Sequence, residues 1–441
     1  MFLKIGISLL KISAHSVRSK WIIETSVNHN LYMRLNITKL CQIKIDVVDN
    51  MKDNKDQKKF TVKNDILETI GDTPIVKLSG LIDFFELKSD LYAKIEYLNP
   101  GGSIKDRIGI SMVEGAKKEG EIEKGGVIIE PTSGNTGVGI AIASSLNNYK
   151  TVFTMPSKMS KEKELLLNAH GGKVIRTPTD VAPEEPNSYY SVAEVVRNLI
   201  WEKEKIIDDQ ELEEIIEFVK KLVEEDHIEE LKKILNKDIN ASKNAYLPNQ
   251  YENEYNPLAH RKTTGPEIVR QMGNELDYFF AGLGTGGTIS GIGDHLRDNI
   301  KVKIIGVDPE GSIISLVKDG MKEEKAKEKA ETYLTEGIGE DLIPETLDLE
   351  IIDEIVKTDD QTSFSMTRFL AREEGIMAGG SSGSVLVGAV KYLKRNDITD
   401  KNALVILPDT GRNYLTRLYD DDWMEEKGLE TNDEKILEEL R

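Results

Sequence analysis

The sequence predicts an α/β fold in which helices cover a mostly parallel β-sheet. From residue 66 onward, short runs of β-branched and aromatic residues alternate with stretches of helical periodicity. This alternation is typical of strand–helix–strand units. The composition, with 39% hydrophobic and 31% charged residues in 441 positions, suits a soluble globular protein of one large or two moderate domains.

Six strands are predicted from the apolar runs, most of which end in Gly, Pro, Ser or Thr. They are "GVIIE" (126–130), "TVFTMP" (151–156), "KVIRTP" (173–178), "DYFFAG" (277–282), "VKIIGV" (302–307) and "ALVILP" (403–408). In an open α/β sheet, ligands bind beyond the carboxyl ends of the strands. The loops that follow these runs are therefore where we expect the functional residues.

An acidic stretch at residues 203–243 interrupts the alternation. Apolar residues from Leu212 to Leu222 recur at helical spacing, and Asp226 stands three residues before Glu229, the spacing of a capping box that opens a second helix. We interpret the stretch as a helical hairpin inserted into the fold. A solvated decoration without a catalytic part is the favoured role, and a partner-docking or regulatory arm is the alternative.

We interpret the first 62 residues as an N-terminal extension. Basic residues and serines precede the first acidic residue, Glu24, as in organelle transit segments. An unstructured extension is the other interpretation, with Met51 as an alternative start. No apolar run reaches the roughly 18 residues of a membrane span.

Charge and cysteine content exclude several classes of function. The net charge of -19 disfavours binding to nucleic acid or to an anionic membrane, because long-range electrostatic steering would be repulsive. Cys41 is the only cysteine, so the chain forms no internal disulfide and no cysteine-based zinc site. We expect no metal site and a cytoplasmic enzyme that acts on small molecules.

The loop "AGLGTGGTISG" (281–291) directly follows a predicted strand. Its glycines free the backbone to turn tightly, so that consecutive N–H groups at a helix N-terminus can surround a phosphate group. The loop lacks the lysine of a P-loop, and an ordinary glycine-rich turn is the alternative.

Two further loops carry polar side chains. In "EPTSGNTGVGIAIA" (130–143), the hydroxyl groups of Thr132, Ser133 and Thr136 suit a carboxylate, and the Asn135 amide can donate to an anionic oxygen. In "GIMAGGSSGSVLVGAV" (375–390), Ser381 is predicted either to cap a helix or to present its hydroxyl group to the crevice.

Lys105 lies in "GGSIKDRIG" (101–109), behind two glycines and before an amphipathic helix. An isolated lysine is usually a solvated charge, but a lysine nucleophile must be partly desolvated. A lysine, an asparagine, a phosphate loop and a serine, all at strand or helix ends, are together the groups that pyridoxal phosphate requires.

These motifs identify a resemblance to the fold type II pyridoxal-phosphate enzymes, and within them to the cysteine synthase/cystathionine β-synthase family. It runs from about Ile66 to Gly428. The motifs that carry it, in the family's order, are "IGDTPIVKL", "NPGGSIKDRI", "EPTSGNTGVGIA", "GTGGTISGI", "GVDPEGS", "EGIGEDLIP", "AGGSSGS" and "LPDTGRNYLTRLYDDDWM".

The resemblance implies a tryptophan synthase β-like fold of two α/β domains with pyridoxal 5'-phosphate in the cleft between them. It implies a catalytic core at residues 63–428, with a smaller subdomain at about 107–195, the insertion at 203–243 and a tail at 429–441. It also implies a homodimer.

The resemblance also implies roles for single residues. Lys105 forms the Schiff base and moves the α-proton, while Asn135 contacts the cofactor O3' and Ser381 the pyridine nitrogen. The phosphate loop is formed by Gly284, Thr285, Gly286, Gly287 and Thr288. Thr132, Ser133, Thr136 and Gln250 bind the substrate carboxylate, and Tyr251 assists the leaving hydroxyl group or else only packs near the site.

The reaction implied is β-replacement on L-serine by L-homocysteine through an aminoacrylate, which yields L-cystathionine. Cysteine synthase, with O-acetylserine and sulfide as substrates, is the alternative on the same fold. The forms "VDPEGS", "EGIGEDLIP" and "RNYLTRLYDDDWM" favour the cystathionine enzyme. A non-enzymatic ligand-binding or interaction protein is the third hypothesis.

Two departures from the vertebrate-type enzyme limit these implications. Cys41 has no nearby histidine in the haem-binding arrangement, so we expect no haem. The chain ends within about thirty residues of the "LPDTGRNY" motif, which leaves no room for a paired C-terminal regulatory module. We therefore expect no activation by adenosylmethionine.

Overall fold

The computed structural model of the chain describes residues 62–441 except 133, 160 and 180. The predictions for the N-terminal extension, including Cys41 and Met51, and the role predicted for Ser133 fall outside these residues.

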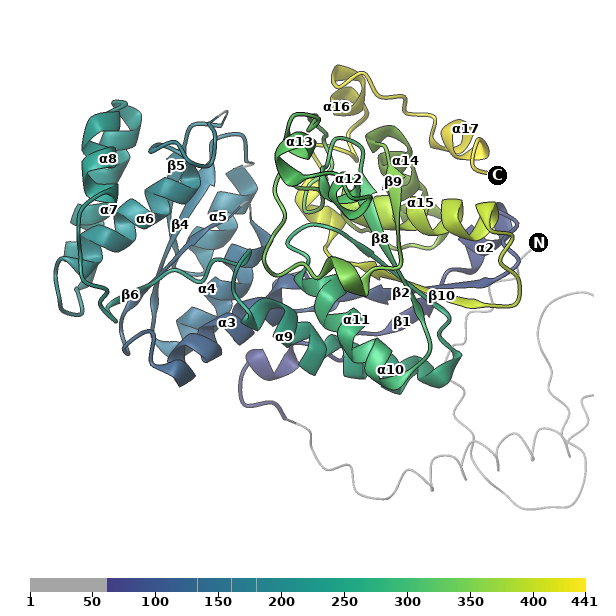
Figure 1. The fold of residues 1–441 in the computed structure, drawn as a ribbon, viewed down its shortest axis with the longest axis horizontal. Helices are drawn as coiled ribbons and strands as arrows, with labels where there is room; N and C mark the ends of the chain where they lie inside the picture. The colour runs from purple at the N-terminus through teal and green to yellow at the C-terminus, as the bar shows by residue number, and fades with distance from the viewer. Residues whose placement is uncertain (1–61, 133, 160, 180) are drawn as a thin grey trace, which may run out of the picture. The chain divides into compact units, whose positions relative to one another are not determined.

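The larger of two sheets has six strands in the order β1-β2-β10-β7-β8-β9 (Figure 1). Their bounds are β1 Ile75–Lys77, β2 Asp90–Ile95, β7 Tyr278–Gly282, β8 Lys303–Pro309, β9 Glu354–Thr358 and β10 Asn402–Leu407. The edge strand β1 pairs antiparallel to β2, and all other neighbours are parallel. The carboxyl ends of the parallel strands therefore meet at one edge.

Helices cover both faces of this sheet because its strands are apolar on both sides. In β10, Ala403, Val405 and Leu407 face one hydrophobic cluster, whereas Leu404 and Ile406 face the other. The first cluster includes α2 (Ser79–Phe84), α14 (Asp360–Glu373) and α15 (Gly380–Arg395), and the second includes α10 (Thr264–Met272) and α11 (Gly287–Asn299).

The smaller sheet has four parallel strands in the order β5-β4-β3-β6. They are β3 Val127–Pro131, β4 Lys150–Pro156, β5 Lys173–Thr177 and β6 Ala245–Tyr246. One face packs on a cluster that includes α3 (Lys105–Glu119), α4 (Asn135–Asn147) and α5 (Lys161–Ala169). The other packs on α6 (Tyr189–Trp201), α7 (Asp209–Glu224) and α8 (Ile228–Leu235).

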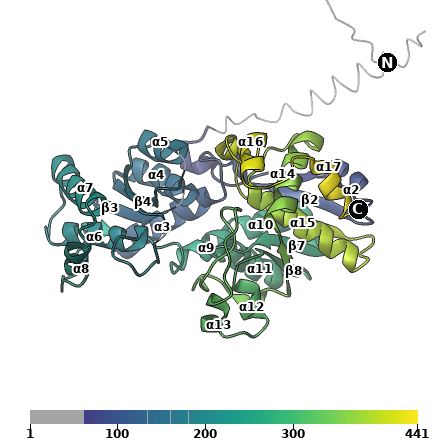
Figure 2. The same cartoon turned by 90° about the horizontal axis from the view of Figure 1, so that it is seen from above.

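Helix α9 (Tyr255–Lys262) connects the two sheet layers, since it packs against both α3 and α11 (Figure 2). The remaining helices are α12 (Ile314–Lys318), α13 (Glu323–Lys327), α16 (Asp421–Glu426) and α17 (Asp433–Glu438). No helix in the described part of the chain combines the length and apolar character needed to cross a bilayer.

The six predicted strands are confirmed, with ends that shift by at most two residues. The smaller sheet extends past residue 195, the predicted end of the smaller subdomain, because Ala245 in β6 pairs with Val127 in β3. The acidic insertion lies between these strands in the sequence. It packs its apolar residues, including Ile216 and Val219, into the same cluster as Val127.

The predicted capping box at Asp226 is also wrong. Asp226 adopts a left-handed φ of 54°, and the residue that precedes α8 is His227, whose side chain forms no cap. The capping box of this insertion lies at Asp208 and Glu211, which open α7 and exchange both side-chain-to-backbone hydrogen bonds.

Candidate active site

Lys105 is the first residue of α3, and the loop before it is held against the end of β10. Gly102 has a φ of 81°, which favours glycine, and its carbonyl group accepts a hydrogen bond from the Thr410 N–H at 3.1 Å. The Ile104 N–H donates to the Pro408 carbonyl at 2.7 Å. These contacts place the Lys105 side chain at the carboxyl ends of the parallel strands.

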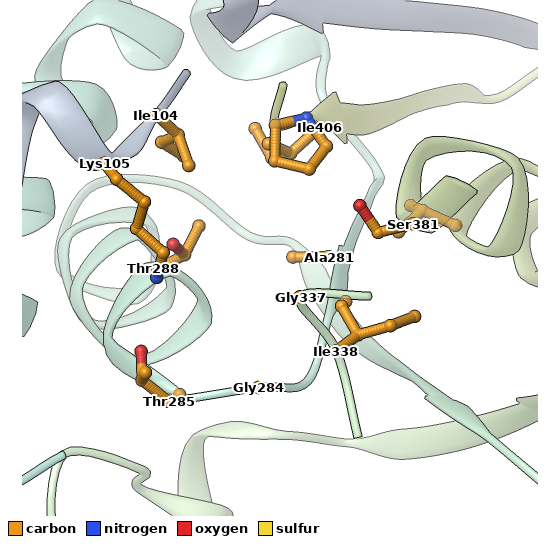
Figure 3. Close-up of a pocket in the computed structure, with 14 residues that line it drawn as sticks. Ile104, Lys105, Ala281, Gly284, Thr285, Thr288, Gly337, Ile338, Ser381 and Ile406 are labelled. Carbon is orange, nitrogen blue, oxygen red and sulfur yellow. The ribbon is translucent and has the colours of Figure 1, made fainter. Parts of the chain in front are cut away.

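A cavity lies at this point, and Lys105 forms part of its wall (Figure 3). The other lining residues come from the loop after β7, from the start of α15, from the end of β10 and from a loop at 337–338. The full set is Ile104, Lys105, Ala281, Gly282, Gly284, Thr285, Gly286, Thr288, Gly337, Ile338, Ser381, Val385, Ile406 and Pro408.

Burial lowers the pKa of the Lys105 amine to about 8, although the negative charges of Glu340 and Asp409 act in the opposite direction. At pH 7 this corresponds to roughly one amine in ten without its proton, compared with about one in several thousand for a solvated lysine. The cavity therefore holds an amine that can act as a nucleophile or a base.

The glycine loop forms part of the cavity wall. Gly286, with a φ of 81°, precedes α11, and a β-carbon there would lie 2.3 Å from the Cβ atom of Leu347. Among the described residues, none accepts a hydrogen bond from the backbone N–H groups of Gly284 to Thr288. Free N–H groups at a helix N-terminus suit a phosphate group.

Two buried side chains, those of Asn256 and His260, contact this loop. Asn256 donates through Nδ2 to Thr285 Oγ1 at 3.1 Å, and a β-carbon on Gly287 would lie 2.0 Å from the Asn256 Oδ1 atom. The imidazole Nε2 of His260 lies 3.3 Å from Thr288 Oγ1. Gly287 therefore contacts Asn256 and is absent from the cavity lining.

Ser381 lies in the first turn of α15 and lines the cavity on the wall opposite Lys105 (Figure 3). No side-chain hydrogen bond caps the start of this helix. Of the two hypotheses for Ser381, the structure therefore favours a hydroxyl group that faces the crevice over a helix cap.

Asn135 begins α4 and is held by Asp409, which sequence reasoning missed. The Asn135 Nδ2 donates to Asp409 Oδ2 at 2.8 Å, and the Tyr414 hydroxyl group donates to the same oxygen at 2.7 Å. Burial raises the pKa of Asp409, and these two donors lower it. Asn135 is not among the cavity-lining residues. The sequence signal for Asp409 was its place in "LPDTGRNY", directly after a predicted strand.

Three of the four predicted carboxylate-binding residues, Thr132, Thr136 and Gln250, lie at the start of α4. Thr136 Oγ1 donates to Gln250 Oε1 at 2.6 Å, although 113 residues separate them in the sequence. Thr132 Oγ1 accepts from the Gly134 N–H at 3.1 Å. The Glu130 carboxyl group accepts from the backbone N–H of Gln250 at 3.3 Å, so β3 positions this residue.

Tyr251 lies beside a cluster of aromatic and acidic side chains and outside the cavity lining. Its ring centroid is 6.3 Å from that of Tyr190. Burial raises the pKa of the Tyr251 hydroxyl group well above its usual value.

Residues 66–409 match the family model described as pyridoxal-phosphate dependent enzyme. The chain belongs to this family. The cofactor, enzyme and fold-class predictions are therefore confirmed, because the amine, the free N–H loop and the Ser381 hydroxyl group in one cavity are a donor set that fits pyridoxal phosphate.

Individual relatives show which members of the family this chain resembles. A cystathionine β-synthase from Apis mellifera is 41% identical over 83% of this chain and 63% of its own length. An O-acetylserine dependent cystathionine β-synthase from Helicobacter pylori is 33% identical with a TM-score of 0.61, over 81% of this chain and 99% of that one. A cysteine synthase from Entamoeba histolytica is 28% identical with a TM-score of 0.66, over 87% and 97% of the two chains.

The family resemblance predicted from the motifs is confirmed by these matches. The chain spans about three fifths of the length of the curated relatives that it matches first.

Proposed function

We propose that this enzyme catalyses β-replacement on L-serine with L-homocysteine, which produces L-cystathionine. The observation that carries the proposal is a cavity that contains the Lys105 amine, the Ser381 hydroxyl group and the Gly284–Thr288 loop, whose backbone N–H groups have no acceptor among the described residues. The curated relatives, at 37–41% identity, support the choice of this reaction among those of the family.

Pyridoxal phosphate, when bound, supplies the electron sink that makes the α-proton of the amino acid acidic. In this proposal Lys105 carries the cofactor through its amine, and the N–H groups of Gly284 to Thr288 hold its phosphate group. Asn135 and Ser381 contact the ring at O3' and at the pyridine nitrogen. Ser381 is a neutral hydroxyl group that does not hold the ring nitrogen protonated, which favours prompt β-elimination over a long-lived carbanion.

The chain's own residues then bind and deprotonate the substrate. Thr132, Ser133, Thr136 and Gln250 bind the carboxylate. This fixes the α-carbon near Lys105, whose Nζ removes the α-proton and later returns it. The hydrogen bond from Thr136 to Gln250 supports the grouping, because it joins two of the four residues directly.

A specific observation favours a second candidate. One solved relative is named an O-acetylserine dependent cystathionine β-synthase and another a cysteine synthase, so the chain resembles enzymes with an activated serine as substrate. The alternative is O-acetylserine as the amino-acid substrate, with sulfide as the nucleophile.

A paired-substrate assay on the purified holoenzyme separates the two candidates. We expect turnover of serine with homocysteine to exceed that of O-acetylserine with sulfide, measured as cystathionine and cysteine by mass spectrometry. A preference for the second pair by about tenfold or more would overturn the cystathionine assignment. Family and cofactor would be unaffected by that result.

We further propose a cytoplasmic homodimer that takes part in transsulfuration, on the strength of the family resemblance alone. Light scattering coupled to size-exclusion chromatography should return about twice the 49.4 kDa mass of one chain. A monomer of full specific activity would contradict the dimer.

A further inference from the structure

Asp409 directly follows Pro408, which lines the cavity, on the loop after β10. Its side chain is buried, with 3% of its surface exposed. Its carbonyl group accepts from the Gly379 N–H at 3.0 Å, and the residues on either side of it are hydrogen-bonded to the loop that precedes Lys105. The backbone therefore holds Asp409 between the helix starts that carry Lys105 and Ser381.

The hydrogen bonds of the Asp409 carboxyl group all fall on one of its oxygens. Oδ2 accepts from Asn135 Nδ2 at 2.8 Å and from the Tyr414 hydroxyl group at 2.7 Å, whereas Oδ1 is buried without a partner among the described residues. Oδ1 lies so close to the backbone that a β-carbon on Gly379 would be 2.1 Å from it. A buried oxygen without a partner is destabilising, so stability alone gives no reason for an acid at this position.

The side-chain amide of Asn135 has two N–H donors on Nδ2 and one acceptor oxygen. One N–H donates to Asp409 Oδ2, and no described residue accepts from the other. Without Asp409, the amide would be free to turn about its χ2 torsion and to exchange its nitrogen and oxygen ends, which differ little in shape. The acceptor oxygen of Asp409 therefore selects the orientation in which the second N–H is available to a ligand.

The proposed role of Asn135 needs this orientation. O3' of pyridoxal phosphate is a phenolic oxygen beside the carbon to which Lys105 is joined, and when ionised it only accepts hydrogen bonds. An N–H at this position stabilises the ionised oxygen, whereas the oxygen end of the amide would repel it. The direction of the Asn135 amide therefore affects both the affinity for the cofactor and the charge of O3', on which the visible absorption of the cofactor depends.

We propose that Asp409 is a positioning residue, which holds the Asn135 amide so that its second N–H points to the cofactor oxygen O3'. The inference rests on the proposed function, in which Asn135 contacts the ring at O3'. Asp409 is absent from the cavity lining and acts through Asn135, and the Tyr414 hydroxyl group fixes the same Asp409 oxygen.

A double-mutant cycle on the full-length holoenzyme tests whether Asp409 acts through Asn135. Wild type, Asp409→Ala, Asn135→Ala and the double variant are each dialysed against a series of pyridoxal 5'-phosphate concentrations, and the bound cofactor is quantified after its release in alkali. We expect each single substitution to weaken the apparent affinity for the cofactor by about tenfold or more, as for the loss of a hydrogen bond to an ionised oxygen. In the Asn135→Ala background, we expect Asp409→Ala to change this affinity by less than about threefold, because residues that act through one another have non-additive effects.

The absorption spectrum at saturating cofactor is the second readout, since a merely structural role would leave it unchanged. Asp409→Ala and Asn135→Ala should both shift absorption from the visible band to the near-ultraviolet band of the form with a neutral O3'. Asp409→Asn keeps the size of the side chain and one acceptor oxygen, so we expect a smaller loss of affinity, about three- to tenfold. This variant replaces Asp409→Ala in the cycle if the alanine variant does not fold.

Asp433→Ala is the matched control. Asp433, at the start of α17, is also buried, and its Oδ1 atom also lacks a partner among the described residues, but it lies outside the cavity lining. We expect an unchanged spectrum and a cofactor affinity within about twofold of the wild type, because distant sites act independently.

The outcomes separate this inference from the function on which it rests. Additive losses in the cycle, a wild-type spectrum in Asp409→Ala beside a shifted one in Asn135→Ala, or a larger loss in Asp409→Asn than in Asp409→Ala would overturn the role of Asp409. Wild-type affinity in Asn135→Ala would instead overturn the contact with O3' in the proposed function. Both readouts are measured without substrate, so a failed turnover of serine with homocysteine changes neither.

Discussion

Replacement of Lys105 by alanine is expected to abolish β-replacement, with a loss of at least about 10⁴-fold in turnover. Two functions are lost together, because the proposed role gives this amine both the covalent bond to the cofactor and the transfer of the α-proton. Lys105 is the lysine that lines the described cavity, where burial lowers its pKa to about 8. Among the described residues, no other lysine lines this cavity.

The measurement has a readout that does not depend on turnover. Borohydride reduction of the wild-type holoenzyme should leave a stable cofactor adduct on the peptide that contains Lys105, detectable by mass spectrometry. Lys105→Ala should lack the adduct and the visible absorption band that shifts when serine is added. Lys117→Ala is the control: it lies on the same helix, and its amine pairs with Glu114 at the surface at 3.4 Å. An adduct that persists in Lys105→Ala would refute the assignment.

The largest effect on stability is expected at Arg107, two residues further along α3. Its guanidinium group is buried and binds two carboxylates: Glu96 at 2.8 and 2.9 Å, and Glu267 at 2.7 Å through both of its terminal nitrogens. Burial alone would raise the pKa of Glu267, but Arg107 and Lys94 lower it to about 2. Both carboxylates therefore have this cation as their partner in a buried ion pair.

Arg107→Met removes the charge and keeps an apolar chain of similar length. Because the two carboxylates would remain buried with one fewer cation, we expect the free energy of unfolding to fall by about 3–5 kcal/mol. Urea unfolding followed by circular dichroism measures the change. Arg270→Met, which breaks an exposed pair with Asp72, is the control and should have little effect. A midpoint shift no larger than that of the control would mean that Arg107 is dispensable for stability.

The sequence predicted the strands of both sheets because their side chains are apolar on both faces. "ALVILP" has no alternation, and in β10 its neighbouring residues Val405 and Leu404 face opposite clusters. The apolar pattern did not predict the edge strands β1, β6 and β9, of which β1 has three residues and β6 has two, or the inner strand β2, which has Asp90 and Lys94 among its six residues. Such runs have too few apolar positions to stand out, and β6 forms only because β3 provides its pairing partner.

The candidate site was partly predictable for a topological reason. Lys105, the Gly284–Thr288 loop and Ser381 lie at the starts of helices that follow strands or loops of the parallel sheet, and parallel strands bring their carboxyl ends to one edge. Asp409 was missed because it acts on a residue far away in the sequence. It contacts Asn135 across 274 positions.

By itself, the sequence determined the alternation of strands and helices, the loops that carry reactive side chains and the pyridoxal-phosphate family. These properties depend on local pattern and on motif order, which a linear chain contains. Only the tertiary structure decided which groups face the cavity, that the acidic insertion packs onto the smaller sheet, and that Asp409 is a buried acid beside Asn135. Burial and proximity change the chemistry of a side chain, and both arise from segments that meet only when the chain is folded.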